Sequence, residues 1–351
     1  MSEMRDEMLR TLDRIVEDTV TIAVREAADE RASGGRAGGA EGFVAAPLWK
    51  ALEEAGITAI GAGGDDDVAF ADAMELVRRA GYHALPVPVA ETIIARRVLT
   101  RAGIAAPEGA MTLAPPGAGP LPTFADGKLA GTAKSVPYGR SSGHVLVATL
   151  SHLHLVDARE AVAARGSNIA GEPSDTIDLA RARLVARAPV ADADAIVAVE
   201  GALVRAVQLS GALSAALDHS LTWVNDRIQF GRPIAKHQAV QHLMAQLAEE
   251  AAAAGAAADL AIEASASAPD LMAVAIAKSR TGEAAGKAAN IAHAAFGAMG
   301  FTREHALHYT TRRLWSWRNE FGSEVHWQTQ IGRAVAAAGG RGLWPWLTRA
   351  D

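Results

Sequence analysis

Three long alanine-rich helical stretches, separated only by short interruptions, constrain the fold of this 351-residue chain more than any other feature. They occupy residues 192–227, 236–264 and 268–300. Alanine has the highest helix propensity, and its small side chain lets neighbouring helices approach closely. Long helices joined by short connections pack side by side in alternating directions, so we expect a four-helix bundle within residues 189–351.

The first part of the chain has the same helical character. Apolar residues recur there at spacings of three and four, which is the period of one helix face. Pro47 stands where a helix begins and Gly56 where it ends, as the backbone preferences of these residues favour. We therefore expect an N-terminal helical domain over residues 1–106, with helices at residues 3–30, 47–56, 65–83 and 87–103.

The pattern changes between these two helical regions. Proline and glycine become dense after residue 105, and short apolar or alternating runs such as "HVLVATLSHLHLVD" replace the helical spacing. Turn signals at "DGK", "SSG" and "GEP" separate the runs. We expect residues 107–188 to form a small β sandwich or barrel. The predicted fold is thus mainly α, with a small central β domain between two helical parts.

Composition excludes several classes of function. Half of the residues are hydrophobic and 21% are charged, which is typical of a folded globular protein. The formal charge is −6 and basic residues form no long run, so we expect no nucleic-acid partner. We also expect no membrane span and, because the N-terminus is charged, a cytoplasmic location. The chain has no cysteine, and its histidines do not show the spacing of a metal site.

The helical pattern breaks once in an informative way, at residues 225–241, "NDRIQFGRPIAKHQAVQ". Gly231 and Pro233 end one helix and let the next begin. Arg227 carries a planar fork that suits phosphate, and the free N–H groups of the new helix start favour an anion. The alternative is an ordinary helix–helix turn in which the arginine caps the preceding helix.

Three stretches resemble the flavin-dependent acyl-CoA dehydrogenases. "DRIQFGRPIAKHQAVQHLMAQLA" is similar to the family's Arg-x-x-Phe-Gly turn and the glutamine-rich helix start that follows it. "AHAAFGAMGFTREHALHYTTRRL" looks like the Gly-rich turn after the third bundle helix, and "PLWKALEEAGITAIG" resembles an N-terminal segment of the family. The chain is most similar to short bacterial members from steroid, aromatic or branched acyl-CoA breakdown. Some of those work as α2β2 assemblies of unlike subunits.

The resemblance implies an activity, a cofactor and partners. The family reaction is α,β-dehydrogenation of an acyl-CoA thioester. A carboxylate removes the α-proton while the β-hydrogen leaves as hydride to N5 of FAD. The reduced flavin then passes its electrons to an electron-transfer flavoprotein or a similar acceptor. A homo- or hetero-oligomer, as a dimer or tetramer, is also implied.

The same resemblance implies which residues contact FAD. Arg227 takes the place of the family arginine that contacts the FAD pyrophosphate of a neighbouring subunit. The second flavin element has the pattern Gln-x-x-Gly-Gly-x-Gly, and Ala294 stands here in place of its glutamine. A Gly-x-x-Gly pair at a helix end is also an ordinary helix cap. The further residues that these motifs assign to the cofactor are Gln229, Phe230, His237, Gln238, Gly297, Gly300 and Ser323.

The β insert differs from the family pattern. We find no "TEP-x-x-GSD"-like turn and no tryptophan strand there, although full-length members use both to contact the flavin ring. Residues 131–143, "GTAKSVPYGRSSG", are the only polar candidate. This implies that the chain binds FAD poorly alone or supplies only the half of the site that crosses a subunit interface.

Glu320 is the first candidate for the catalytic base. The family base is a glutamate in a Tyr-Glu-Gly-Thr-like loop before the last helix. Aligning Gly322 and Ser323 with its Gly-Thr pair puts Phe321 at the catalytic position, one residue after Glu320. The alternative is that Glu320 forms a structural ion pair with Arg312, Arg313 or Arg318.

Glu200 is the second candidate. Some family members carry the base on the first bundle helix, and counting back from Arg227 places Gly201 at that position. A one-residue offset on a helix turns a side chain by about 100°. Two functions therefore stay open: a dehydrogenase that is active alone or in a hetero-oligomer, and a non-catalytic subunit that completes the FAD site or scaffolds a partner.

Overall fold

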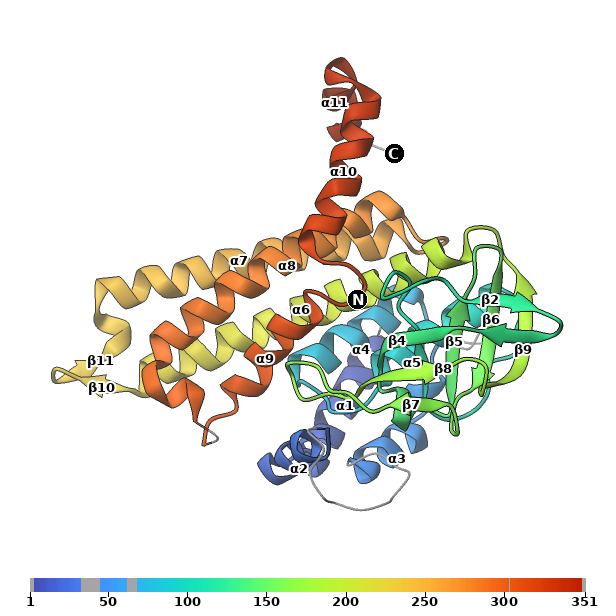
Figure 1. Cartoon of the computed structure of the whole chain (residues 1–351). Helices are drawn as coiled ribbons and strands as arrows, with labels where there is room; N and C mark the ends of the chain where they lie inside the picture. Colours follow the sequence, from blue (N-terminus) through green and yellow to red (C-terminus); the bar gives the residue numbers. More distant parts are fainter. Residues whose placement is uncertain (1–2, 33–44, 62–67, 303, 349–351) are drawn as a thin grey trace.

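A computed structural model describes residues 3–32, 45–61, 68–302 and 304–348. It confirms the expected plan of an N-terminal helical part, a small β part and a C-terminal helical bundle (Figure 1). The bundle helices extend away from the β strands, and a two-stranded hairpin projects from their far end. The last two helices stand off the body as an arm.

The N-terminal helices match the predicted ones except at one point. Residues 3–30 form two helices rather than one, with a break at Val20 and Thr21. Thr21 lies in a β-branched run, and its hydroxyl accepts the Val24 N–H at 3.3 Å, so it caps a new helix. Residues 65–67 of the third predicted helix lie outside the described part. The elements are α1(Glu3–Thr19), α2(Ile22–Ala32), α3(Ala46–Glu54), η1(Ile57–Ala59), α4(Phe70–Tyr82) and α5(Val89–Arg101).

The β part contains two small sheets that enclose an apolar core of their own. One sheet has the order β1-β5-β6-β9 and the other β4-β8-β7, while β2 and β3 form a hairpin. Val145, Val156 and Ile177 lie in the core that both sheets share. The elements are β1(Met111–Leu113), β2(Thr123–Ala125), β3(Lys128–Ala130), β4(Thr132–Pro137), η2(Gly139–Ser141), β5(His144–Ala148), β6(His152–Asp157), β7(Val162–Ala164), β8(Ser174–Asp178) and β9(Arg183–Pro189).

The C-terminal bundle is built around α6. Its 18-residue apolar window would be long enough to cross a membrane, but 89% of that window is buried inside the protein. The elements are α6(Ala193–Asp226), β10(Ile228–Gln229), β11(Arg232–Pro233), η3(Ile234–Lys236), α7(Gln238–Ala264), α8(Leu271–Phe296), η4(Gly297–Phe301), α9(Leu307–Trp317), α10(Glu324–Ala338) and α11(Gly340–Leu347).

One continuous core joins all three parts of the chain. Leu99 of α5, Leu155 of β6 and Val207 of α6 belong to the same buried cluster. Helices α4 and α6 cross in backbone contact, because a Cβ atom on Gly211 would lie 2.0 Å from the Arg78 carbonyl oxygen. The three parts are therefore packed on one another rather than linked as independent domains.

Candidate functional site

The break at residues 225–241 is a β-hairpin rather than a plain helix–helix turn. Strands β10 and β11 pair through Gln229 and Arg232, and Phe230 and Gly231 form a two-residue turn. Both turn residues have positive φ, 53° and 79°, as a type I′ hairpin requires. Phenylalanine is strained in this conformation, yet its side chain is 91% exposed at the tip. Such strain on an exposed apolar residue is typical of a binding site.

The surroundings of this hairpin suit an anion. Arg227, Arg232 and Lys236 contribute three positive charges, and α7 begins at Gln238 with unpaired backbone N–H groups. Arg232 lies 3.3 Å from Nδ1 of His237. The other ring nitrogen of His237 is buried without a hydrogen-bond partner. The predicted residues of the first flavin element therefore gather at one helix start.

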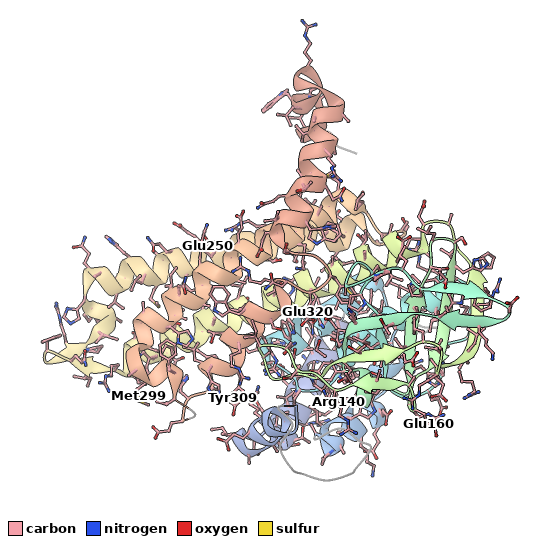
Figure 2. All side chains as sticks on the ribbon, viewed as in Figure 1. Arg140, Glu160, Glu250, Met299, Tyr309 and Glu320 are labelled. Carbon is pink, nitrogen blue, oxygen red and sulfur yellow. The ribbon has the colours of Figure 1, made fainter. Side chains whose placement is uncertain are left out.

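The structure brings the second predicted flavin element to the same end of the bundle. The guanidinium of Arg227 lies over the ring of Trp223, 5.7 Å from its centroid. Trp223 stacks on Phe296 with centroids 4.8 Å apart and an interplanar angle of 12°. Phe296 ends α8, and Gly297 and Gly300 follow it in η4. Figure 2 marks this end of the bundle with Met299.

The two glycines of this second element have clear structural roles. Gly297 caps α8 with a φ of 63°. A Cβ atom on Gly300 would lie 2.9 Å from Nδ1 of His293, so only glycine fits without a shift. The turn thus serves as a helix cap, as the alternative interpretation proposed, and a flavin contact there stays a prediction.

A groove lies beside this turn, between α8, η4 and α9. Its volume is about 660 Å³, and aromatic, basic and neutral polar side chains line it. Trp315 and Phe301 expose 37% and 73% of their surface at its walls. A groove without an acidic lining residue, in a chain of net charge −6, favours an anionic ligand that carries a ring. The lining residues are Asn290, His293, Ala294, Phe301, His308, Thr311, Arg312 and Trp315.

Glu320 lies in the turn between α9 and α10, where the bundle meets the β part (Figure 2). Its carboxylate accepts hydrogen bonds from Arg205 at 2.8 Å, Asn168 at 2.9 Å and Ser316 at 3.2 Å. Arg205 also forms an ion pair with it at 2.7 Å, and only 18% of the Glu320 side chain is exposed. The expected ion-pair alternative is therefore present, but its partner comes from α6 rather than from α9.

Arg205 belongs to a buried cluster of charges that joins α5, α6, α9 and the β part. It is 1% exposed and pairs with Glu91 of α5 at 2.7 Å. Nearby, Glu172 of the β part pairs with Arg313 of α9 at 2.9 Å. Burial raises the pKa of Glu91, and Arg205 offsets only part of that rise. Burial also raises the pKa of Glu172, but Arg313 and Arg205 outweigh it and leave that pKa lowered.

Glu200 points away from this turn. It is fully buried and pairs with Arg97 of α5, with an Nε–Oε1 distance of 3.1 Å. Arg97 also donates to the carbonyl oxygen of Ser265 at the end of α7. Burial raises the pKa of Glu200, and its second carboxylate oxygen has no hydrogen-bond partner.

The two positions that the family alignment assigns to the base touch each other in this structure. The ring of Phe321 packs against Gly201, and a Cβ atom on Gly201 would lie 2.1 Å from Phe321 Cδ1. Phe321 is 7% exposed and has a φ of 52°. An aromatic ring and a glycine therefore occupy the place where a carboxylate would be needed for proton abstraction.

The turn that carries Glu320 and Phe321 is held rigidly. Lys278 of α8 is fully buried, and its Nζ donates to the carbonyl oxygens of Arg318 at 2.7 Å and Gly322 at 2.8 Å. Burial lowers the pKa of Lys278 to about 7. Ser323, another predicted flavin residue, follows as the N-cap of α10, and its side chain makes no capping hydrogen bond.

The turn that follows β1 matches the expected flavin-ring pattern only weakly. Residues 114–121, "APPGAGPL", agree with "TEP-x-x-GSD" only at Pro116 and Gly119. Ala114, Pro120 and Leu121 stand where the pattern has Thr, Ser and Asp, so this turn has no side-chain group that could hydrogen-bond a flavin ring.

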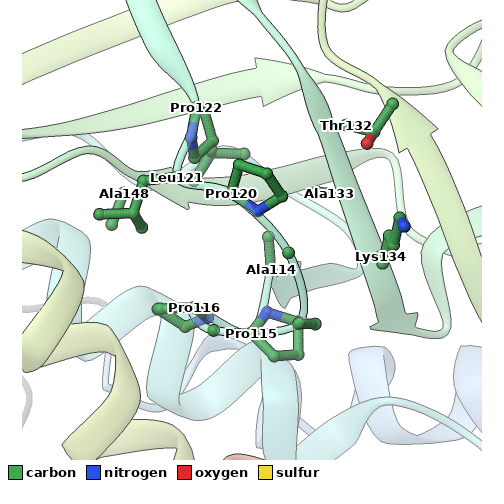
Figure 3. Close-up of a pocket in the computed structure, with 14 residues that line it drawn as sticks. Ala114, Pro115, Pro116, Pro120, Leu121, Pro122, Thr132, Ala133, Lys134 and Ala148 are labelled. Atoms are coloured by element: carbon green, nitrogen blue, oxygen red, sulfur yellow. The ribbon is translucent and has the colours of Figure 1, made fainter.

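Two polar side chains of the candidate segment 131–143 stand beside this turn. The prolines of the turn line a small pocket together with Thr132 and Lys134 (Figure 3). Two other polar residues of the segment are already engaged, because Tyr138 donates to Glu172 and Arg140 binds Asp175. The β part therefore offers few polar side chains to a flavin ring, whereas the hairpin end of the bundle has the charges that suit the phosphates of FAD. In the described ranges, no group of three or more His, Asp or Glu residues is placed to hold a metal ion.

Comparisons with known proteins agree with this architecture. A family model for the acyl-CoA dehydrogenase C-terminal domain matches residues 198–342. The ChsE4–ChsE5 complex from Mycobacterium tuberculosis superposes with a TM-score of 0.81 at 21% identity, over 96% of this chain and 98% of that one. A glutaryl-coenzyme A dehydrogenase in complex with glutaryl-CoA superposes with a TM-score of 0.75 at 19% identity, over 95% and 96% of the two chains. The fold is thus that of the acyl-CoA dehydrogenases.

Sequence similarity supports the same assignment. Acyl-CoA dehydrogenase IpdE2 of Mycolicibacterium smegmatis is 27% identical over 278 residues, which is 76% of this chain and 80% of that relative. Residues 198–342 thus match the C-terminal domain of the acyl-CoA dehydrogenases, and the chain as a whole is similar to members of that family in sequence and in fold.

Proposed function

We propose that this chain is a non-catalytic subunit of an FAD-dependent acyl-CoA dehydrogenase assembly. It supplies flavin-phosphate contacts from its hairpin end to a partner subunit. The partner supplies the carboxylate base and the contacts to the flavin ring. Alone, the chain neither retains FAD nor oxidises acyl-CoA.

The contact between Phe321 and Gly201 carries this proposal. It fills both base positions of the family with groups that cannot take a proton. Glu320 is one residue away, but Arg205 and Asn168 hold its carboxylate. Glu200 is held on the other side of α6 by Arg97.

The exposed hairpin supports the cofactor half of the proposal. Arg227, Arg232 and Lys236 stand at the open end of the bundle rather than in its core. The charged side chains would neutralise and orient a diphosphate there, and the α7 N-terminus would add backbone donors. The turn after β1 of the same chain has no polar side chain of its own for the ring. A cofactor held at the hairpin therefore needs its ring contacts from another subunit.

The reaction of the assembly follows from family chemistry. When bound, FAD would supply the hydride-acceptor chemistry for the β-hydrogen of the acyl-CoA, and an electron-transfer flavoprotein or a similar acceptor would be needed to reoxidise it. The partner subunit would supply the carboxylate that takes the α-proton. This chain orients the phosphates with Arg227 and its neighbours, and it closes its own base position with Phe321.

A second candidate function keeps Glu320 as the base of an active dehydrogenase. The observation in its favour is that the Glu320 side chain is still 18% exposed in the turn where the family base lies. To act, the carboxylate would have to leave Arg205 in the presence of substrate.

Purification of the chain alone, and after co-expression with a candidate partner of the same family, separates these functions. We expect a colourless protein alone and a flavin absorbance spectrum with the partner. Glu320→Gln is expected to leave dye reduction by acyl-CoA unchanged in the assembly. Glu250→Gln, which alters an ion-paired carboxylate on α7, is the matched control. A yellow, active chain alone that loses activity with Glu320→Gln would overturn the proposal.

A further inference from the structure

We propose that Trp223 is a positioning residue that orients the side chain of Arg227. We also propose that His305 makes this orientation dependent on pH. The inference rests on the proposed function only in assigning a ligand to Arg227. The contacts on which it stands are side-chain contacts of this chain alone. They form a continuous row of side chains from the hairpin to the start of α9, made of Arg227, Trp223, Phe296 and His305.

The row begins at the exposed guanidinium. Arg227 has no carboxylate partner among the described residues, and its guanidinium lies over the face of Trp223, 5.7 Å from the ring centroid. A planar cation on an aromatic face loses much of its rotational freedom. Trp223 itself is fixed because it stacks on Phe296, which is 4% exposed at the end of α8. The orientation of Arg227 therefore depends on how α8 ends.

His305 closes the row from the other side. Its ring lies edge-on to Phe296 at 4.6 Å and to Trp223 at 5.9 Å. It also meets His219 of α6 at 5.9 Å, again edge to face. His305 therefore fixes the segment that follows η4 against the same two aromatic rings that support Arg227.

The hydrogen bonds of His305 require a neutral ring. Nδ1 accepts the backbone N–H of Leu307 at 3.1 Å, where α9 begins. A backbone N–H can only donate, so Nδ1 carries no proton in this arrangement. Protonation of Nδ1 would remove the acceptor and would turn a bond at the start of α9 into a clash between two donors.

The surrounding charges do not compensate a protonated ring. Among the described residues, no carboxylate forms an ion pair with His305 or His219. Burial, and then the neighbouring His308, lower the pKa of His305. Burial, His305 and Arg25 lower the pKa of His219, and Asp218 opposes them only weakly as the last cause.

The remaining charged groups nearby do not stabilise a protonated His305 either. His293 of α8 has a pKa lowered by burial and by His308. Arg227 adds a positive charge on the far side of Trp223. Glu304 is exposed beside His305 in the same segment, and no ion pair joins the two. Acidification therefore loosens the segment after η4, and Arg227 loses its support as a consequence.

The test uses nuclear magnetic resonance of the full chain without flavin or partner. The Arg227 side chain should show an upfield ring-current displacement from Trp223. Trp223→Leu should abolish the displacement, and Trp223→Phe should keep most of it. Far-UV circular dichroism checks that both variants are folded.

The pH arm of the test uses two variants of His305. Between about pH 7.5 and about pH 5, the Arg227 displacement in the wild-type chain should fall as histidine titrates. Hydrogen exchange of residues 297–302 and 304–307 should lose protection by up to about tenfold per pH unit for each proton taken up. His305→Phe keeps the ring contacts and His305→Asn keeps an acceptor for Leu307, and neither takes up this proton. Both should therefore respond to pH much less than the wild-type chain, in which His305 titrates along with its neighbours.

Two results would overturn the inference. One is the same Arg227 signal in the wild-type chain and in Trp223→Leu. The other is a pH response in both His305 variants that is as large as in the wild-type chain. Failure here leaves the proposed function standing, because neither flavin nor partner enters the measurement. Failure of the flavin experiment above would leave the ring-current and exchange results unaffected. The two failures are therefore distinguishable.

Discussion

At the scale of single residues, a small number of substitutions decide what this chain can do. The fold is that of the acyl-CoA dehydrogenases, yet Gly201 and Phe321 stand at the positions that the resemblance assigns to the base, and the turn after β1 is apolar. Arg227 and its neighbours at the hairpin keep the chemistry of a phosphate site. The carboxylate and the polar turn residues are missing at one end of the bundle, while the phosphate-binding cations are present at the other. This pattern is expected of a subunit that completes a partner's site.

Truncation of Phe321 tests whether its ring has become part of the core. Phe321→Ala should lower the free energy of unfolding by about 3–4 kcal/mol, because the buried ring leaves a cavity against Gly201. Urea denaturation followed by circular dichroism measures this loss. Phe230→Ala removes the same ring from an exposed position and should change stability by no more than about 0.5 kcal/mol. A small loss of unfolding free energy for Phe321→Ala would contradict the conclusion that its ring is part of the packed core.

Lys278 predicts a pH dependence of stability. Its pKa falls from the ordinary 10.5 to about 7 in the folded chain because burial disfavours the charged form. Between those two pH values the unfolded chain carries a proton that the folded chain lacks, so stability increases as pH rises. The unfolding free energy should increase between pH 7 and pH 9 by up to about 1.4 kcal/mol per unit.

The matched variant for this prediction is Lys278→Met. It keeps the length of the side chain but cannot titrate, so its stability should rise less steeply over the same pH range. Urea unfolding at a series of pH values gives both slopes. Identical slopes for the two proteins would show that Lys278 keeps its proton throughout.

At the scale of elements, the hairpin between α6 and α7 has a strained turn that lowers stability and an exposed apolar tip. Phe230 adopts a left-handed φ of 53°, which costs a non-glycine residue about 1–2 kcal/mol. Asparagine tolerates this conformation far better. The strained residue is also the most exposed large apolar side chain of the described part. A feature that costs stability and faces outward is explained by a partner that covers it.

Phe230→Asn separates the two effects. The isolated chain should be as stable as the wild type or more stable by about 1 kcal/mol, because the turn is relieved of strain. Assembly with the partner subunit should weaken, as measured by analytical ultracentrifugation of the mixed subunits. Val325→Asn, at another exposed apolar position on α10, provides the control. Unchanged assembly for Phe230→Asn would remove the hairpin tip from the interface.

At the scale of the whole molecule, periodic features of the sequence predicted the architecture well. Helices α6, α7 and α8 begin and end within a few residues of the expected ranges, because their apolar spacing and caps are local signals. The split between α1 and α2 was missed because a single threonine cap outweighed a continuous helical pattern.

The site was less predictable because its contacts are distant in sequence. Arg205 and Glu320 lie 115 positions apart, and no local pattern pairs them. The contact between Gly201 and Phe321 is of the same kind: a family alignment marks both positions, but only the packed structure shows that they fill one space. No "TEP-x-x-GSD"-like turn is recognisable in the sequence, and the turn after β1 has Ala114, Pro120 and Leu121 where that pattern has polar residues.

The division of labour between unlike subunits predicts the flavin content of the assembly. If the β part of this chain cannot hold a flavin ring, each pair of unlike subunits contains only the one ring site that the partner provides. Titration of the flavin-free assembly with FAD should therefore saturate at one flavin per pair. Arg227→Ala should weaken that site, since it removes a phosphate contact. Lys134→Met, beside the proline-lined pocket of the β part, should leave it unchanged. Saturation at two flavins per pair, with one lost in Lys134→Met, would show that this chain binds a flavin of its own.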